Sequence, residues 1–150
     1  MIQPPDRSYD ARVVAKSPRI LIADDESQLL RVLVRVLEQQ GYTVISAPDG
    51  KAAAEALRGA PEAIDVIVID AAIDPEGAGP VLEWVAEEQP QIGVIVTSGD
   101  QLSDPLRSRV LANNGIFLLK PFLPKALVQA IEDLIAQGKA VEDVIAWGDE

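Results

Sequence analysis

One uninterrupted apolar run in the sequence ends in a carboxylate: Val66-Ile67-Val68-Ile69-Asp70. Its four apolar residues are all β-branched and do not alternate with polar residues, which is the pattern of a strand buried on both faces of a parallel sheet. Open sheets of this kind bind their ligands at the carboxyl ends of the strands. The run therefore predicts an α/β fold with Asp70 at the functional edge. Taken alone, it does not distinguish that role from an Asp in an ordinary turn.

Shorter apolar runs and segments with helical spacing alternate on both sides of this run. In the helical segments, apolar residues recur every three or four positions, as expected for helices packed on a sheet. Alternating strands and helices predict parallel βαβ units with right-handed crossovers, and so a three-layer, doubly wound (βα)5 sheet of five strands. The expected strands besides 66–70 are 19–23, 42–47, 92–96 and 116–119, and the expected helices are 29–40, 51–58, 80–88, 105–113 and 124–136.

The composition restricts the chemistry. The 150 residues suit one domain, and they include neither cysteine nor histidine. Disulfides, thiol nucleophiles, Ser-His pairs and the usual zinc sites are therefore excluded. Any proton or phosphoryl chemistry has to use carboxylates, hydroxyls, lysine and bound ions.

Charge and hydropathy restrict the partners. The formal net charge is −11, and the stretch from Gly59 to Leu106 holds ten acidic residues and no basic one. Because nucleic-acid binding depends on basic residues, this composition argues against direct contact with DNA or RNA. No segment approaches the roughly 20 apolar residues of a membrane-spanning helix, and the N-terminus lacks the apolar core of a signal peptide. We expect a soluble, cytoplasmic protein without a membrane partner.

Polar residues stand where four of the predicted strands end. Asp24 and Asp25 follow the first strand, Asp70 ends the third, Thr97 ends the fourth and Lys120 follows the fifth. Parallel strands share one carboxyl edge, so these side chains are expected to converge on one site. Clustered carboxylates without histidine favour a hard divalent cation such as Mg²⁺.

The acidic triplet Asp24-Asp25-Glu26 has an alternative interpretation, because Asp25 or Ser27 could cap the following helix. Capping accounts for one of the acids but not for three together.

These residue types suit phosphoryl transfer. With a cation bound, Asp70 can remain ionised and attack a phosphoryl group to form an acyl phosphate. The cation, the Lys120 ammonium and the Thr97 hydroxyl can offset the charge on the transferring group. The site is predicted to accept phosphoryl groups.

Over about 19–136, the chain resembles the receiver domains of two-component response regulators. The resemblance rests on four motifs in the family's order and spacing: Ile-Leu-Ile-Ala-Asp-Asp-Glu, Val-Ile-Val-Ile-Asp, Val-Ile-Val-Thr-Ser and Phe-Leu-Leu-Lys-Pro-Phe. It implies the flavodoxin-like strand order 2-1-3-4-5. Residues 1–18 are then a flexible N-terminal arm, 19–136 the receiver domain, and 137–150 a C-terminal tail with a short amphipathic segment that we expect to fold back on the domain.

The resemblance also implies a metal site. Asp70 is the phospho-acceptor, Asp25 is the direct Mg²⁺ ligand with Asp24 beside it, and the backbone carbonyl of Ala72 is a further metal contact. Mn²⁺ is an expected substitute for Mg²⁺.

A conformational switch is implied as well. Thr97 is the switch hydroxyl, Phe117 is the aromatic switch residue, and Lys120 is the lysine that pairs with the phosphate. The Lys120–Pro121 peptide bond is expected to be cis.

The implied function is that of a single-domain response regulator, similar to the chemotaxis regulators, and not of an enzyme beyond its own phosphorylation and autodephosphorylation. A sensor histidine kinase or a histidine phosphotransfer protein would donate the phosphoryl group to Asp70. A downstream protein would bind the face formed by the fourth helix, fifth strand and fifth helix, and a homodimer is also allowed.

Alternatives of other classes are weaker. A haloacid-dehalogenase-type hydrolase needs a second Asp where Ala72 stands, and the acids after the first strand would repel the phosphate of a flavin. A receiver-shaped interaction module that is not phosphorylated stays open. The reason is that the loop Ala71–Gly79 looks one residue longer and more acidic than the family's.

Overall fold

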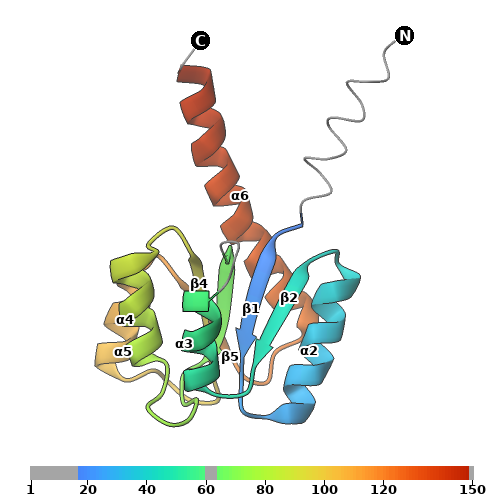
Figure 1. The fold of residues 1–150 in the computed structure, drawn as a ribbon, viewed down its shortest axis with the longest axis vertical. Helices are drawn as coiled ribbons and strands as arrows, with labels where there is room; N and C mark the ends of the chain where they lie inside the picture. Colours follow the sequence, from blue (N-terminus) through green and yellow to red (C-terminus); the bar gives the residue numbers. More distant parts are fainter. Residues whose placement is uncertain (1–16, 60–63, 149–150) are drawn as a thin grey trace.

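The computed structural model describes residues 17–59 and 64–148, with side chains described as far as residue 137. The predicted arm at 1–18 therefore lies almost wholly outside the described residues. Within them, five strands alternate with five helices (Figure 1). The strands are β1 (Arg19–Ala23), β2 (Thr43–Ala47), β3 (Val66–Asp70), β4 (Gly93–Ser98) and β5 (Ile116–Leu119). The helices are α2 (Ser27–Gln39), α3 (Gly50–Gly59), α4 (Gly79–Glu88), α5 (Asp104–Ala112) and α6 (Pro124–Gly148).

The strands form one parallel sheet in the order β2-β1-β3-β4-β5, so the predicted fold class and strand order are confirmed. β3 lies at the centre, and all five of its residues are buried, as the continuous apolar run predicts. The carboxyl ends of the strands share one edge of the sheet.

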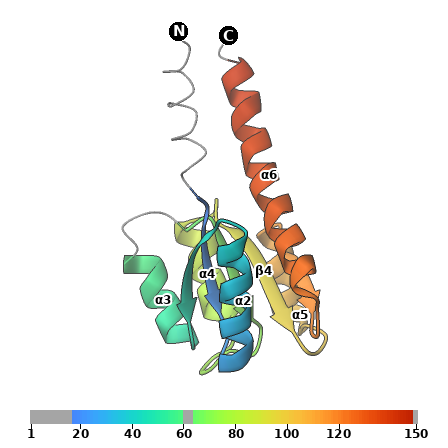
Figure 2. The same cartoon turned by 90° about the vertical axis from the view of Figure 1, so that its right-hand side faces the viewer.

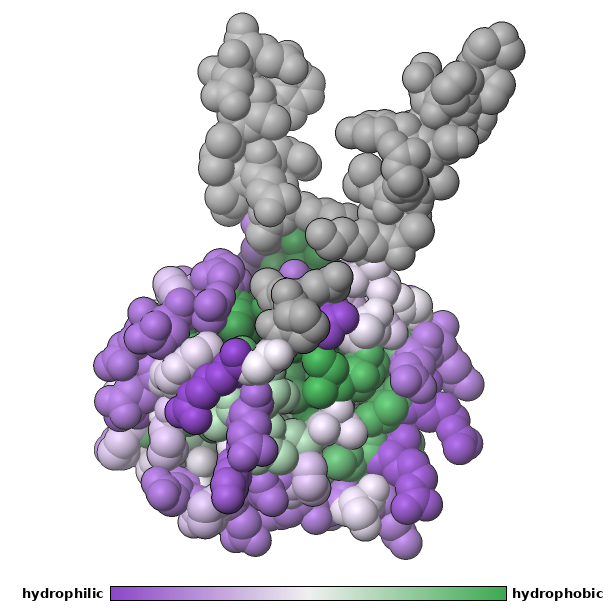
Figure 3. Space-filling view, in the orientation of Figure 1, coloured by the Kyte–Doolittle hydropathy of each residue, from purple (hydrophilic) through white to green (hydrophobic). Residues whose placement is uncertain are grey.

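Helices cover both faces of the sheet, which gives three layers (Figures 1 and 2). Alternate residues of each strand point to opposite faces, so each face has its own core. In β3, Ile67 and Ile69 pack towards α3, α4 and α5, whereas Val66 and Val68 pack towards α2 and α6. The edge strand β2 is covered less completely. Figure 3 shows apolar surface where the sheet is visible between α3 and α2, and Ile45 of β2 is only partly buried.

The predicted end of the last helix at Ala136 is wrong, because α6 continues to Gly148. Its backbone passes beyond the sheet edge opposite the carboxyl ends of the strands, so the segment expected to fold back on the domain is, as far as Gly148, part of α6 (Figures 1 and 2). A lone glycine such as Gly138 costs about 1 kcal/mol in a helix interior, and no proline follows to stop the helix.

A glycine closes the turn between α5 and β5. The Gly115 N–H donates to the Val110 carbonyl at 2.8 Å, and a Cβ on Gly115 would lie 2.9 Å from the Val94 carbonyl oxygen. We expect Gly115→Ala to lower the free energy of unfolding by about 1–3 kcal/mol, because backbone atoms would have to move. Gly99→Ala is the control, since a Cβ there meets nothing within 4 Å. Urea unfolding of both variants checks the difference, and equal losses would contradict it.

Candidate functional site

Strand register brings the polar residues to one side of the sheet. Asp70 pairs with Thr97, and Ala23 pairs with Ile69, so Asp24 follows opposite Asp70. Side chains alternate along a strand, and paired residues of neighbouring strands point to the same face. Asp24, Asp70 and Thr97 therefore all point to the face that carries α2 and α6.

Lys120 joins this group from the fifth strand. Its backbone N–H donates to the Ser98 carbonyl at 2.7 Å, which holds it beside the end of β4. Its Nζ lies 2.9 Å from Asp24 Oδ2, 3.0 Å from Asp70 Oδ1 and 2.9 Å from Glu26 Oε1. The structure thus gathers the predicted Asp24, Asp70, Thr97 and Lys120 at one edge. The Lys120–Pro121 bond is cis, as expected.

The carboxylates at the site are mostly buried. Asp24 is 3% exposed and Asp70 is 8% exposed, and Thr97, which pairs with Asp70 in the sheet, is 3% exposed. Backbone N–H groups help to satisfy the two acids: Glu26 N donates to Asp24 Oδ1 at 2.8 Å, and Ala72 N donates to Asp70 Oδ2 at 3.2 Å. Each acid therefore presents one oxygen to Lys120 and one to the backbone.

Burial and charge act on the pKa values in opposite directions. Burial raises the pKa of Asp24 above its ordinary value, and the hydrogen bonds from Glu26 N and Lys120 offset this only in part. For Lys120, burial by itself would lower the pKa, but its hydrogen bonds to Asp24, Glu26 and Asp70 outweigh that effect and raise the pKa. Lys120 is therefore firmly protonated at neutral pH.

Asp25 lies apart from the Lys120 contacts. It is exposed, and its Oδ2 accepts a long hydrogen bond of 3.4 Å from Asp74 N in the loop after β3. This loop is the one predicted to be longer than usual. It is held by the fully buried Ile73 and by a 2.7 Å hydrogen bond from Gly50 N to the Asp74 carbonyl. The Ala71–Gly79 loop therefore packs against the domain and stays close to Asp25.

The structure does not support the alternative interpretation in which Asp25 or Ser27 caps the helix α2. The N-cap residue of α2 is Glu26, and its side chain makes no capping hydrogen bond. Neither Asp25 nor Ser27 takes that position.

Among the described residues, no three acids form a ready-made metal-ligand group. Asp24 and Asp70 each direct one oxygen at Lys120, while Asp25 contacts the loop. Mg²⁺ commonly uses only one or two carboxylates and completes its shell with waters and substrate phosphate. The all-oxygen donor set at this edge fits that preference.

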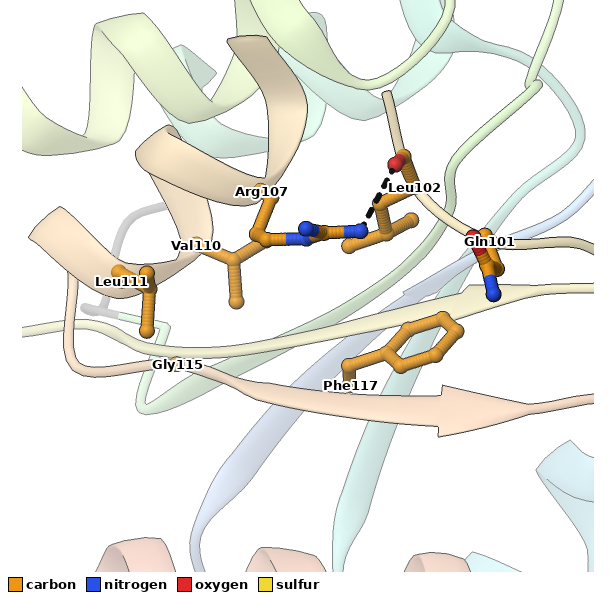
Figure 4. A pocket seen from close by; sticks show the side chains of 7 residues that line it. All are labelled: Gln101, Leu102, Arg107, Val110, Leu111, Gly115 and Phe117. Carbon is orange, nitrogen blue, oxygen red and sulfur yellow. Dashed lines mark hydrogen bonds between the residues drawn. The ribbon is translucent and has the colours of Figure 1, made fainter. Parts of the chain in front are cut away.

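Phe117 lies on the other side of the sheet from Lys120. It pairs with Val96, whose side chain faces the core under α3, α4 and α5, and it is 38% exposed. It lines a pocket of about 340 Å³. Figure 4 shows the lining side chains between α5, β5 and the segment before α5. The pocket is lined by Gln101, Leu102, Arg107, Val110, Leu111, Gly115 and Phe117.

Sequence reasoning missed Glu26 and the pocket. Glu26 is the third acid of its triplet, and its place directly after Asp24 and Asp25 is a signal that it could reach the Lys120 ammonium that Asp24 also contacts. No sequence signal linked Gln101 and Arg107 to Phe117, because their proximity depends on how α5 packs on β5.

The described part of the chain has no helix that combines enough length and hydropathy to cross a membrane.

Comparison with known protein families decides the class. The family model for the response regulator receiver domain matches residues 20–132. The chain belongs to this family. Receiver domains are the phospho-accepting signalling domains of two-component systems, in which they work with histidine kinases, and they are not generally classed as enzymes.

Several relatives resemble this receiver domain. The transcriptional regulatory protein PrrA of Mycobacterium tuberculosis is 33% identical over 79% of this chain and 50% of its own length. The transcriptional regulatory protein GlrR of Escherichia coli K12 is 28% identical over 85% of this chain and 28% of its own length. The chain thus spans half or less of these two relatives.

A solved structure has the same fold. The CheY-like response regulator receiver domain protein of Methanospirillum hungatei JF-1 matches with a TM-score of 0.75 and 24% identity, over 83% of this chain and 99% of that protein.

Proposed function

We propose that this receiver domain accepts one phosphoryl group on Asp70, and that the modification changes which proteins bind to it. The observation that carries the proposal is the distance of 3.0 Å between Lys120 Nζ and Asp70 Oδ1, at a carboxylate that is largely buried yet still open to solvent at the sheet edge. A fixed cation beside a strand-end carboxylate suits the stabilisation of a transferring phosphoryl group.

In the proposed step, an Asp70 carboxylate oxygen attacks the phosphorus atom of the donor. An oxygen–phosphorus bond forms, the bond from phosphorus to the donor breaks, and its electron pair leaves with the donor. Lys120 then donates to a phosphoryl oxygen. The hydroxyl of Thr97, which pairs with Asp70 in the sheet, donates to a second phosphoryl oxygen.

Asp24, Asp25, Asp70 and the Ala72 carbonyl are proposed to hold Mg²⁺, or Mn²⁺ in its place. When bound, such a cation offsets negative charge on the phosphoryl oxygens. The chain itself supplies the oxygen ligands, with Asp24 and Asp70 adjacent in the register.

The switch is proposed to couple Thr97 to Phe117. Thr97 pairs with Leu118, the residue after Phe117 in β5. A movement of Thr97 towards a modified Asp70 would therefore change the packing of β5 beside Phe117. Phe117 already lines a pocket with free volume, which gives its ring room to change position. Phosphorylation is proposed to shift the population between two arrangements of Thr97 and Phe117.

The proposed partner surface is the face formed by the fourth helix, fifth strand and fifth helix, which are α5, β5 and α6. Of the five large apolar side chains that are exposed in the described part of the chain, four lie on or next to this face. They are Leu111, Phe117, Leu119 and Leu123. The proposed phosphoryl donor is a histidine kinase or histidine phosphotransfer protein, and the output is a protein bound at this face or a second copy of the chain. This proposal concerns residues 20–132 and does not depend on what is joined to them.

Incubation with acetyl phosphate tests the proposal. With Mg²⁺ present, we expect the intact mass to rise by one phosphoryl group, and reductive trapping followed by peptide mapping to locate it on Asp70. Chelation of the divalent cation is expected to slow the reaction at least about a hundred-fold, because the charge stabilisation it removes is worth several kcal/mol. A protein that gains no mass with Mg²⁺ and fresh acetyl phosphate would instead support a receiver-shaped interaction module that is not phosphorylated.

A further inference from the structure

The ammonium group of Lys120 contacts three carboxylates in the resting structure, and two of these contacts, to Asp24 Oδ2 and Glu26 Oε1, are hydrogen bonds. An ammonium carries three N–H donors and no acceptor. Three different carboxylates lie within 3.0 Å of Nζ, from Asp24, Glu26 and Asp70. A phosphoryl group arriving at Asp70 therefore competes with these carboxylates for the Lys120 ammonium.

The three partners differ in how readily they can be released. The side chains of Asp24 and Asp70 are 4% and 11% exposed, whereas that of Glu26 is 62% exposed. Phosphorylation turns the Asp70 carboxylate into an acyl phosphate, so the partners that remain carboxylates are Asp24 and Glu26. A buried carboxylate such as Asp24 that loses its cation stays desolvated, and that cost is large. Glu26 would be rehydrated at once, so it is the partner that can leave most cheaply.

Glu26 is also committed to this contact in the resting structure. It is the N-cap residue of α2, and its side chain makes no capping hydrogen bond to the free N–H groups of the helix. Instead its carboxylate reaches Lys120, while its own N–H is held by Asp24 Oδ1 at 2.8 Å. The backbone of Glu26 is therefore fixed by one member of the site and its side chain by another.

We propose that Glu26 is a positioning residue that holds Lys120 in the resting arrangement and competes with the phosphoryl group for the Lys120 ammonium. The inference rests on the proposed function of Asp70 and adds a regulatory element to it. Glu26 forms no bond to phosphorus. It opposes phosphorylation because it occupies the needed donor and places a negative charge near the incoming phosphoryl oxygens.

Kinetics of modification by acetyl phosphate test this role. We expect Glu26→Gln to react about two- to five-fold faster than the wild type, the range that an exposed ion pair can account for. The ratio should shrink as salt is raised, since salt screens exposed charges. Glu26→Asp keeps the charge but has a shorter side chain, so it should also react faster. Glu38→Gln removes an exposed acid of α2 that is not one of the Lys120 contacts, and it should match the wild type.

A second measurement needs no phosphoryl donor. Acylation by an amine reagent, read by peptide mass, should modify Lys120 at least about two-fold faster in Glu26→Gln than in the wild type, with Lys51 and Lys125 as internal references. Unchanged labelling of Lys120 would overturn the resting contact. Faster labelling with an unchanged phosphorylation rate would overturn the competition. If no form of the protein, wild type included, takes up a phosphoryl group, the proposed function itself fails and this inference fails with it.

Discussion

Asp70→Asn is expected to abolish the phosphoryl mass gain from acetyl phosphate while leaving the protein folded. An amide oxygen is a much poorer nucleophile than a carboxylate oxygen. No other acid of the site is placed to replace Asp70 as the acceptor. Asp24 lies deeper and already directs one oxygen to a backbone N–H and the other to Lys120. Glu26 contacts the same ammonium, and Asp25 contacts the loop at Asp74 N.

Stability is expected to survive this change. The site holds three carboxylates around one ammonium, so removing one negative charge relieves repulsion at the sheet edge. Urea unfolding should give a free energy at least equal to that of the wild type.

A matched control comes from the same edge of the sheet. Asp100 follows β4 and is exposed, so Asp100→Asn makes the same chemical change without touching Lys120. It should be modified like the wild type. A full mass gain in Asp70→Asn, or its loss in Asp100→Asn, would show that the acceptor lies elsewhere.

Lys120→Met is expected to produce the largest loss of stability among single changes at the site, about 3–5 kcal/mol at pH 7. Methionine is similar in length and can fill the same space. However, it leaves the side chains of Asp24 and Asp70, which are 4% and 11% exposed, without a cation. The exposed Lys125→Met on α6 is the control and should stay within about 0.5 kcal/mol of the wild type.

The loss should shrink as the pH falls from 7 towards 5. In the wild type, burial already raises the pKa of Asp24 above 3.8, and removing Lys120 deletes two contributions that lower it. Folded Asp24 then binds its proton more tightly than unfolded Asp24, so acidification favours the folded state of the variant. Urea unfolding at both pH values measures this. A loss that is independent of pH, or no larger than that of Lys125→Met, would contradict the explanation.

A double variant sharpens the test. Combining Lys120→Met with Asp70→Asn removes one of the two buried acids left without a cation, so part of the lost stability should return.

The sequence predicted the main features of the fold because they depend on local patterns. The continuous run of β3 predicted a strand of a parallel sheet with both faces covered by helices, and all five of its residues are buried in that way. Alternation of strands and helices then put every strand end on one edge, and so brought Asp24, Asp70, Thr97 and Lys120 together. The strand order itself came from the family resemblance, since alternation alone does not determine which strand lies beside which.

Other features depended on distances that periodicity does not encode. Glu26 reaches Lys120, and exposed Asp25 instead contacts the loop at Asp74, although the two acids are neighbours in the chain. The buried Ile73 holds the long loop against the domain, and the packing of α5 on β5 forms the pocket around Phe117.

By itself, the sequence determined the layers of this protein and the edge where its chemistry-bearing residues meet, because burial and alternation are properties of neighbouring residues. Only the tertiary structure decided which carboxylates share the Lys120 ammonium, because that choice depends on side-chain reach across strands far apart in the chain. It also decided where α6 ends, because the sequence around Gly138 weakens a helix without stopping it.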